Sequence, residues 1–509
     1  MSSKVRTRFA PSPTGYLHVG GLRTALFSYL FAKHNGGDFI LRVEDTDQAR
    51  FVQGAIEKLI HILKEMGLDY NEGLIVKDNE LTDSGSHGPY LQSRRKDIYK
   101  KHADILIEQK KAYMCFCDEK RLEELRKEQE ALKQPTRYDR KCRNLSQEEI
   151  KTNLDKGMPY VVRQAVPLEG QTILKDLVYK DIVWDNKTLD DQILLKSDGF
   201  PTYHLAVVVD DHLMEISHVV RGEEWLPSVA KHILLYQAFG WDVPHFAHLP
   251  LLLNKDRSKL SKRQGDVSVE DYLAKGYLKE ALINFVALLG WNPKTDQEIF
   301  SMNELIDQFD LAKVNKSGAI FDNEKLDWLN SQYIKKMDSN ELLNTGIAYL
   351  QKAGLLQEKD GQYVAKNGKS VSVDFLLQIM ALEKDRIKKL SEIGDSIGFF
   401  FMQPTYDPQI LIWRKSNLEN TKHNLQKLLN FMSSMDDSDF KNELSVENKI
   451  KQFIQENNLD NGSVLWPLRV ALSGLEASPG PFQITAILFI GFGKYEILQR
   501  IETALKLLQ

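Results

Sequence analysis

Cysteine is scarce in this sequence: Cys115, Cys117 and Cys142 are the only three in 509 residues. An odd and low number argues against a disulfide framework and for a reducing compartment. The sequence has no run of about 18 apolar residues, so we expect no membrane span. No apolar segment follows the first polar residues, and we therefore expect no secretory signal. A cytoplasmic protein is the expectation.

An excess of charge of one sign is also missing. The chain has 67 basic and 71 acidic side chains and a formal net charge of −4, so its bulk charge does not point to a nucleic-acid partner. An RNA ligand would have to bind local basic patches, with an affinity that falls as salt rises. The composition is that of a globular protein, 42% hydrophobic and 27% charged, and the length suggests about three to four domains.

The first part of the chain alternates between strand and helix patterns. Residues 5–10 and 39–43 have the character of short apolar strands. Apolar side chains recur at spacings of three and four after residue 20, and a second helix is expected over residues 53–66. This alternation predicts an α/β fold with a parallel sheet covered by helices.

The middle of the chain departs from this pattern. Between about residues 95 and 195, a charged helical stretch over 118–132 precedes irregular, strand-like segments at 160–164 and 181–184. We interpret this part as an inserted domain.

The sheet pattern resumes after the insertion and then gives way to helices. Strands are expected at 202–209 and 218–220. Beyond residue 335, amphipathic helices alternate with polar breaks such as 358–367. We therefore predict an all-α C-terminal region.

A glycine-marked loop, Ser12 to Gly21, opens the first predicted helix. Its last two residues, Gly20 and Gly21, would let a flat base or a phosphate approach the backbone. A helix start carries partial positive charge and free N–H groups that suit a polyphosphate, and His18 could hydrogen-bond a phosphate oxygen. A glycine-rich turn with a capping histidine is the alternative, because short glycine motifs recur by chance.

A basic segment follows the second part of the sheet, from Asn254 to Gly265. Five of its twelve side chains are basic, Lys259 and Lys262 among them. Such a loop can close over a triphosphate and neutralise charge that develops in a transition state. A solvated basic loop is the alternative.

Together the two motifs resemble those of class I aminoacyl-tRNA synthetases. These enzymes carry a His-x-Gly-His-like and a Lys-Met-Ser-Lys-Ser-like motif, and this chain has His-Val-Gly-Gly at 18–21 and Lys-Leu-Ser-Lys-Arg at 259–263. A glycine replaces the usual second histidine. Further segments resemble the bacterial glutamyl-tRNA synthetases: residues 8–15, 42–47, 92–94, 198–204, 220–225 and 467–474.

The resemblance implies an ATP-dependent, AMP-forming ligase. It would activate glutamate to glutamyl-adenylate and transfer it to the 3′-terminal ribose of tRNA(Glu), releasing pyrophosphate. A non-discriminating enzyme that also charges tRNA(Gln) stays open. A glutaminyl-tRNA synthetase usually has Pro-Pro-Glu-Pro-Asn-Gly where this chain has Ala-Pro-Ser-Pro-Thr-Gly at 10–15. A non-catalytic RNA-binding paralogue typically loses one of the two motifs, and both are present here.

The resemblance also implies the order of domains. A Rossmann-type parallel-sheet catalytic domain over 1–95 and 201–255 is split by an α+β insertion over 96–200 that binds the acceptor end. A stem-contact region with the basic segment occupies 256–335, and an all-α anticodon-binding region occupies 336–509.

Contacts with the anticodon are expected in that last region. Arg386 aligns with an anticodon-reading arginine of some relatives, and an arginine fork suits a base edge. The alternative is a solvated arginine, which is common on helix surfaces. Relatives are usually monomers, and a monomer is expected here.

Glutamate presents two carboxylates and one ammonium, so its pocket needs about two cations, one anion and orienting polar groups. By resemblance, five residues line this pocket: Arg8, Ser12, Glu44, Tyr203 and Arg221. Which arginine takes the side-chain carboxylate stays open. Val207 stands where some relatives have asparagine, so no role carries over to it.

For ATP, the resemblance implies six residues: His18, Gly20, Glu224, Trp225, Leu253 and Lys262. His18, Lys259 and Lys262 are the expected catalytic residues, and the two lysines would stabilise the α-phosphate while the glutamate carboxylate attacks it. No side-chain nucleophile is needed, because catalysis rests on positioning and electrostatics. Mg²⁺ should accompany ATP, although the sequence shows no group of carboxylates that would form a dedicated Mg²⁺ site.

The cysteines could form a metal site, but one of its usual ligands is missing from the sequence. Cys115, Cys117, Tyr138 and Cys142 resemble a zinc site of some relatives, in which a histidine usually follows the last cysteine by two residues. Asn144 stands there instead. Zinc prefers four ligands, so either the tyrosine hydroxyl completes the site or this part of the fold is metal-free.

Overall fold

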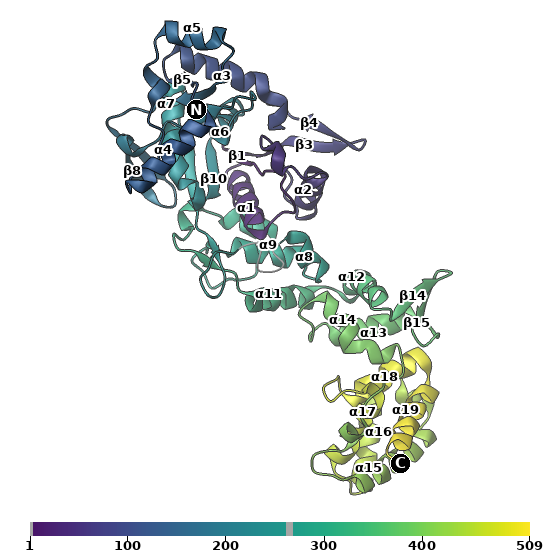
Figure 1. Ribbon diagram of the computed structural model, residues 1–509. Helices are drawn as coiled ribbons and strands as arrows, with labels where there is room; N and C mark the ends of the chain where they lie inside the picture. Colours follow the sequence, from purple (N-terminus) through teal and green to yellow (C-terminus); the bar gives the residue numbers. More distant parts are fainter. Residues whose placement is uncertain (1–3, 261–267) are drawn as a thin grey trace. The chain divides into compact units, whose positions relative to one another are not determined.

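The structure is a computed structural model that describes residues 4–260 and 268–509. Among the residues it describes, we find no helix with the length and apolar character that a bilayer crossing requires. The chain divides into two compact units, Met1–Ala274 with Lys279–Lys325 and Lys275–Leu278 with Leu326–Gln509 (Figure 1).

A mostly parallel sheet forms the start of the first unit. Its strands, in spatial order, are β1 (Arg6–Phe9), β2 (Asp38–Leu41), β3 (Glu72–Lys77) and β4 (Glu80–Ser84). The first three run parallel, and β4 pairs antiparallel with β3. Helices α1 (Val19–His34) and α2 (Ala55–Glu65) connect the parallel strands, which confirms the predicted alternation.

Strand β1 is buried throughout, although two of its four residues are arginines. Buried cations require acidic partners. Arg6 donates to Asp38 at 2.9 Å and to Glu72 at 3.1 Å, and these acids lie on β2 and β3. The sheet is therefore held together by buried ion pairs as well as by its backbone.

A second sheet continues beside the first. Its strands, in spatial order, are β10 (His218–Gly222), β11 (His245–Leu249), β7 (Gln171–Asp176) and β8 (Lys180–Asp185). Strands β10, β11 and β7 run parallel. β1 and β10 lie side by side, and the N–H of Ser217 donates to the carbonyl oxygen of Arg6 at 3.0 Å (Figure 1). The carboxyl ends of β1 and β10 therefore face the same edge.

The expected strand at 202–209 is wrong. These residues begin helix α6 (Tyr203–Leu213), which precedes β10, and α7 (Leu226–Phe239) follows that strand. Residues 205–211 are all buried, so no exposed face interrupts the apolar run. A short run of this kind cannot be distinguished from a strand by periodicity.

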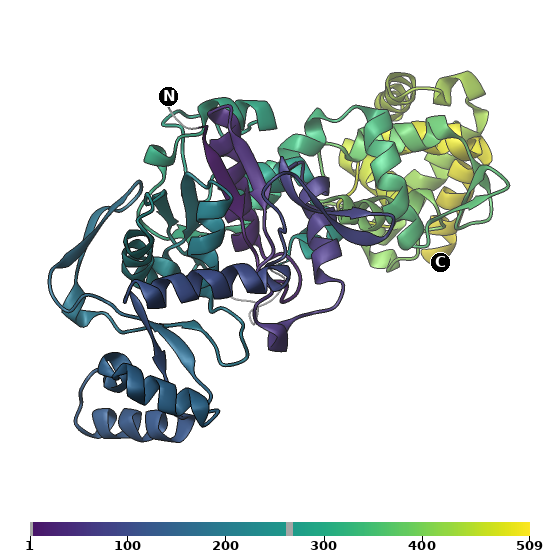
Figure 2. The same ribbon diagram turned by 90° about the horizontal axis from the view of Figure 1, so that it is seen from above.

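The segment predicted as an insertion contributes to two sheets. An antiparallel sheet is formed by β5 (Ala112–Cys115), β6 (Val161–Gln164) and β9 (Ile193–Leu195). Its helices are α3 (Lys96–Glu108), α4 (Glu119–Ala131) and α5 (Gln147–Asp155). All residues of α4 and α5 are exposed or half-buried, and both helices lie at the periphery of the first unit (Figure 2). β7 and β8, from the same segment, instead extend the sheet of β10 and β11.

The rest of the first unit is mainly helical. Strand β12 (Leu252–Leu253) pairs parallel with β13 (Ala319–Ile320). The helices are α8 (Val269–Ala274), α9 (Lys279–Ala287) and α10 (Met302–Gln308).

The second unit packs around one apolar core whose residues range from Ile334 to Leu508. Its helices are α11 (Asn323–Lys336, which starts in the first unit), α12 (Ser339–Lys352), α13 (Val373–Glu383), α14 (Ile393–Ile397), α15 (Leu418–Ser434), α16 (Glu443–Glu456), α17 (Asn461–Ser473), α18 (Pro481–Phe492) and α19 (Lys494–Leu507). The predicted helical character is confirmed.

The region is nevertheless not all-α. An antiparallel sheet is formed by β14 (Leu356–Lys359), β15 (Gln362–Ala365) and β16 (Ser370–Val371). Asp360 and Gly361 join the first two strands with φ of 52° and 75°. Positive φ at both positions is the requirement of a tight two-residue hairpin turn, which Asp-Gly satisfies. The predicted polar break at 358–367 is this hairpin.

Candidate active site

A cavity of about 740 Å³ lies at the carboxyl ends of β1 and β10. Parallel α/β sheets bind their ligands at this edge. The cavity is lined by all five residues predicted for glutamate and by three of those predicted for ATP, namely Arg8, Ser12, Glu44, Tyr203, Arg221, Gly20, Glu224 and Trp225. Segments far apart in the sequence therefore supply one site.

Arg8 reaches the cavity from β1 with an acidic partner. Its Nε and Nη2 donate to the two carboxylate oxygens of Asp211 on α6, at 3.0 and 3.4 Å. Arg42 donates to the same carboxylate at 2.7 Å and to Glu44 at 3.1 Å. Burial opposes the ionisation of Asp211, but Arg8 and Arg42 outweigh it and lower its pKa. The charge of Arg8 is thus partly neutralised within the protein.

Arg221, on β10, has neutral partners instead. Its Nη1 donates to the hydroxyl of Tyr203 at 3.1 Å, and its Nε donates to Nε2 of His248 at 3.1 Å. His232 Nδ1 lies 3.4 Å from Nη1, and the Phe246 ring centroid lies 5.2 Å from the guanidinium carbon. The buried Nη2 has no hydrogen-bond partner among the described residues. Arg221 therefore lines the cavity and has one donor nitrogen without a partner among the described residues.

The start of α1 carries the predicted phosphate-binding features. His18 is the N-cap residue, and its Nδ1 accepts a hydrogen bond from the N–H of Gly20 at 2.9 Å. A Cβ on Gly20 would lie 3.2 Å from that nitrogen, so a larger residue would press on the imidazole. Within α1, all of which the structure describes, the first turn carries no acid. The positive end of the helix dipole is therefore unopposed.

Described residues on both sides of 261–267 form bridges with residues near the cavity. Lys262 lies outside the described residues. Before it, Lys259 forms a bridge with Leu253, and after it Ser268 forms a bridge with His18. One described residue of the segment and one described residue after it thus pair with residues predicted for ATP. His18, Leu253 and Lys259 do not themselves line the cavity.

An aromatic pair borders the cavity. The rings of Tyr203 and Trp225 are 4.2 Å apart between centroids, and Trp225 is 36% exposed, so part of its surface is open to a ligand. The carboxylate of Glu224 folds back onto Gly222, where a Cβ would lie 2.1 Å from Oε2. Only glycine at position 222 permits this position of the carboxylate.

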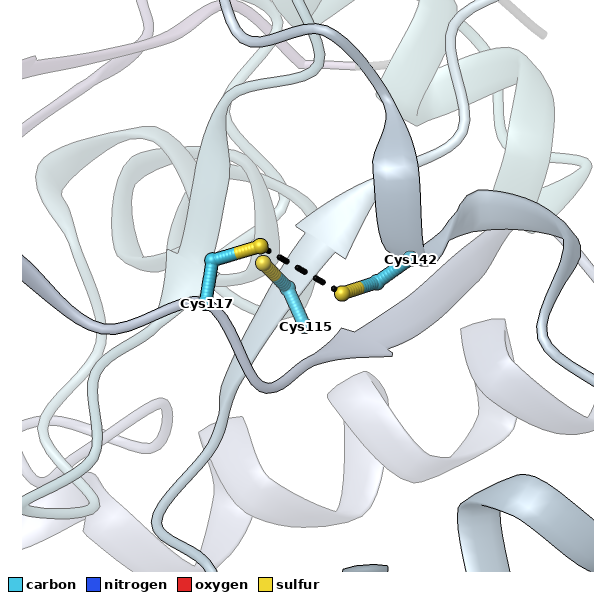
Figure 3. Close-up of side chains that lie close together, drawn as sticks. All are labelled: Cys115, Cys117 and Cys142. Carbon is cyan, nitrogen blue, oxygen red and sulfur yellow. Dashed lines mark hydrogen bonds between the residues drawn. The ribbon is translucent and has the colours of Figure 1, made fainter. Parts of the chain in front are cut away.

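The three cysteines converge in the first unit, near the end of β5. Their sulfurs are turned toward one another and lie within 4.8 Å of one another (Figure 3). The Tyr138 hydroxyl lies 3.3 Å from the sulfur of Cys115 and 3.4 Å from that of Cys117, and the sulfurs of Cys117 and Cys142 are 3.5 Å apart. The hydrogen bond from Cys142 outweighs burial and lowers the pKa of Cys115. All four residues predicted for a metal thus meet.

Arg386 lies in the second unit with an exposed side chain. Its Nε is 3.7 Å from Oε1 of buried Glu383, one turn earlier. Burial lowers the pKa of Arg469, and the charge of Arg386 lowers it further. Arg469 lies over the ring of Trp466, at 4.6 Å. Arg386 therefore keeps an exposed side chain, whereas Arg469 packs on an aromatic ring.

Sequence reasoning assigns no role to four residues that set the charge of the cavity. Asp211 accepts from both Arg8 and Arg42, while His232 and His248 contact Arg221. One available signal is the acidic pair at 210–211 in an apolar run, since buried acids require cations. The histidines carry no comparable signal.

Comparisons with known proteins agree with this geometry. Residues 4–328 match the family model described as tRNA synthetases class I (E and Q), catalytic domain, and residues 347–505 match an anticodon binding domain. A relative named glutamate–tRNA ligase, from Clostridium kluyveri, is 47% identical over 510 residues, covering 100% of this chain and 99% of its own.

Two solved structures are similar over the full length. One is a glutamate tRNA ligase from Elizabethkingia meningosepticum in complex with its amino acid, with a TM-score of 0.88, 38% identity and 100% of both chains covered. The other is a glutamate-tRNA synthetase from Elizabethkingia anophelis, with a TM-score of 0.86, 38% identity, 99% of this chain covered and 100% of the other. The chain belongs to the class I aminoacyl-tRNA synthetases of the glutamate and glutamine branch.

Proposed function

We propose that this chain is a glutamate–tRNA ligase. It activates glutamate with ATP to glutamyl-adenylate, releases pyrophosphate and transfers the glutamyl group to the 3′-terminal ribose of tRNA(Glu), with release of AMP. The observation that carries the amino-acid assignment is that two buried arginines, Arg8 and Arg221, line one cavity, and that Arg221 has no acidic partner among the described residues. The full-length relatives of this name support the reaction.

The two arginines are suited to different carboxylates of glutamate. Arg221 has only neutral partners, so a substrate carboxylate gains the full attraction of its charge. Arg8 already shares the charge of Asp211 and lies near Glu44, which suits the α-amino acid group common to all substrates. We therefore assign the side-chain carboxylate to Arg221, the α-carboxylate to Arg8 and the ammonium to Glu44. Ser12 and Tyr203 orient the substrate by hydrogen bonds.

This assignment predicts different effects of two matched substitutions. Arg221→Gln should lower kcat/KM for glutamate by about tenfold or more while affecting glutamine much less, because it removes a charge that only glutamate uses. Arg8→Gln should lower kcat/KM for glutamate and for glutamine by similar factors. Steady-state aminoacylation with each amino acid measures these changes in kcat/KM. If Arg8→Gln were the variant that affects glutamate much more than glutamine, Arg8 would bind the side-chain carboxylate instead.

The chemistry needs positioned charge rather than a side-chain nucleophile. The start of α1, with His18 and Gly20, binds the phosphates, and Trp225 packs beside the adenosine. Lys259 and Lys262 stabilise the α-phosphate as the glutamate carboxylate attacks it and pyrophosphate leaves. Among the described residues, the one cluster of three or more metal-ligating side chains is that of the cysteines, so Mg²⁺ is expected to enter with ATP.

The test of the whole reaction is ATP–pyrophosphate exchange by the purified chain. We expect exchange with glutamate in the presence of tRNA(Glu), and its absence would overturn the proposal. Charging purified tRNA(Glu) and tRNA(Gln) side by side decides whether the enzyme is discriminating. Light scattering should find a monomer, and a cytoplasmic location follows from the reaction.

For the tRNA, we propose that the insertion holds the acceptor end and that the second unit reads the anticodon. The exposed side chain of Arg386 offers a cation, which suits unpaired bases. Arg386→Gln should raise the KM for tRNA about tenfold and leave the KM for ATP unchanged. An unchanged KM for tRNA would leave Arg386 as an ordinary surface residue.

We also propose that the cysteine cluster binds zinc. A tetrahedral site with Zn–S bonds of about 2.3 Å separates its ligand atoms by about 3.5–3.8 Å. The sulfurs of Cys117 and Cys142 are 3.5 Å apart, all three sulfurs lie within 4.8 Å of one another, and the Tyr138 hydroxyl is 3.3 and 3.4 Å from two of them, which supports a site of about this size. Zinc there would fasten β5 to the loop that carries Cys142. Elemental analysis should find about one zinc per chain and clearly less for Cys117→Ser, whereas a zinc-free wild type would contradict the proposal.

A further inference from the structure

His248 lies behind Arg221 and is completely buried. Its Nε2 must accept the hydrogen bond from Nε of Arg221, since a guanidinium only donates. Its single proton is therefore on Nδ1, which donates to Asp176 at 2.7 Å. Burial lowers the pKa of His248 more than Asp176 raises it, which agrees with a neutral ring.

Asp176, at the end of β7, determines which nitrogen of His248 carries the proton. Its Oδ1 accepts hydrogen bonds from the backbone N–H groups of Val178 and Tyr179, at 2.9 and 2.8 Å. Its Oδ2 accepts from the backbone N–H of His248 at 3.2 Å and lies 2.7 Å from Nδ1 of the same residue. An ionised carboxylate can only accept, so the contact at 2.7 Å requires the imidazole to donate from Nδ1.

His232 repeats the arrangement on a second side of Arg221. It is 1% exposed on α7, its Nδ1 faces Nη1 of Arg221 at 3.4 Å, and its Nε2 lies 2.9 Å from Nδ1 of His204. The network gives Nε2 the proton, which it donates to His204. Burial, with the charge of Arg221, lowers the pKa of His232 well below its ordinary value. This ring too is neutral.

The two buried arginines that line the cavity thus have partners of different charge. Arg8 is bonded to a carboxylate, whereas Arg221 is surrounded by two imidazoles, a phenol and an aromatic ring. No carboxylate of the described residues forms an ion pair with Arg221. A buried cation without a countercharge attracts an anionic ligand far more than a neutral one.

We infer that His232 and His248 are specificity-determining positioning residues, which orient Arg221 through neutral acceptors and so reserve its charge for a side-chain carboxylate. The inference rests on the proposed function and extends it. Glutamine has the shape of glutamate but cannot supply the missing charge. The enzyme therefore discriminates glutamate from glutamine because Arg221 is a cation and because the protein gives this cation no acidic partner.

The test is the matched pair His232→Glu and His232→Gln, which differ in charge and hardly in shape. Among the described residues, His204, Tyr203 and Arg221 contact His232 and none of them is acidic, so the carboxylate introduced by His232→Glu would neutralise Arg221. We expect His232→Glu to raise the KM for glutamate at least about tenfold above that of His232→Gln. The ratio of kcat/KM for glutamine over glutamate should rise by a similar factor. The KM for ATP reports whether the remainder of the site is intact and should change little in either variant.

Asp176→Asn tests the same inference from the other side. The side-chain oxygen of the new asparagine would keep the hydrogen bonds from the two backbone N–H groups, so its NH₂ group would face Nδ1 of His248. The imidazole proton would then move to Nε2, where it would face the Nε–H of Arg221. We expect a higher KM for glutamate with an unchanged KM for ATP. Equal KM values and selectivity for the two His232 variants would overturn the inference, as would a wild-type KM in Asp176→Asn. Loss of pyrophosphate exchange by the wild-type chain would count against the proposed function instead.

Discussion

Replacing Asp211 by asparagine should destabilise the first unit, because it leaves two buried arginines without their shared countercharge. Asp211 is 2% exposed and accepts from Arg8 at 3.0 Å and from Arg42 at 2.7 Å. Asparagine keeps the shape and one acceptor but not the charge. Removal of one partner from a buried ion pair costs about 3–5 kcal/mol, and we take about 3 kcal/mol because the shape is retained.

Calorimetry can measure this loss. For a unit of this size, about 3 kcal/mol corresponds to a fall of roughly 6 °C in the Tm of its transition. The matched control is Asp104→Asn, which breaks an exposed pair with Lys100 (2.9 Å) and should cost at most about 0.5 kcal/mol. Equal Tm values for the two variants would refute the reasoning.

The pH dependence supplies a second check on Asp211. Its folded-state pKa lies below the ordinary value of 3.8, so its contribution to stability is fully present above that pH. The contribution is lost as pH falls through the folded-state pKa. The Tm difference between wild type and Asp211→Asn should therefore be constant near neutral pH and shrink in acid. A difference that grows on acidification would contradict the assigned sign.

Three further predictions concern other parts of the first unit. Lys262→Ala should lower pyrophosphate exchange about 100-fold while calorimetric glutamate binding changes little, and equal losses would contradict its role at the α-phosphate. Gly222→Ala should raise the KM for ATP about tenfold, because the new Cβ meets Glu224 at 2.1 Å; an unchanged KM would show that the carboxylate moves without consequence. Burial opposes ionisation of Glu72, but hydrogen bonds from Tyr90, His87 and Arg6 lower its pKa to about 2. Its stabilisation is therefore present above pH 4.5 and lost toward pH 2, so Glu72→Gln should flatten the acid side of the stability profile.

The residues that meet in the cavity could be predicted because they belong to short, contiguous motifs. Gly20 follows a strand and opens a helix, and this order alone places it at the sheet edge where ligands bind. The partners of the arginines could not be predicted in this way. Arg8 and Asp211 are 203 positions apart, and only the tertiary fold shows that they pair.

The errors in secondary structure have local causes. Helix α6 is buried on all sides over residues 205–211, so its sequence lacks the polar face that identifies a helix. The hairpin of β14 and β15 is exposed along most of its length and therefore lacks an apolar pattern. Its Asp360-Gly361 turn was the available signal, and short polar segments with such a dipeptide deserve the hairpin interpretation.

The place of β7 in the fold limits how this enzyme could be re-engineered. A shortened protein without residues 96–200, or a chimaera that borrows this stretch from another synthetase, would lose the strand next to β11 and with it Asp176. Replacing the segment that we propose to hold the acceptor end would therefore also remove the carboxylate that contacts His248. A graft that keeps 171–185 from the host would retain this contact beside the amino-acid cavity.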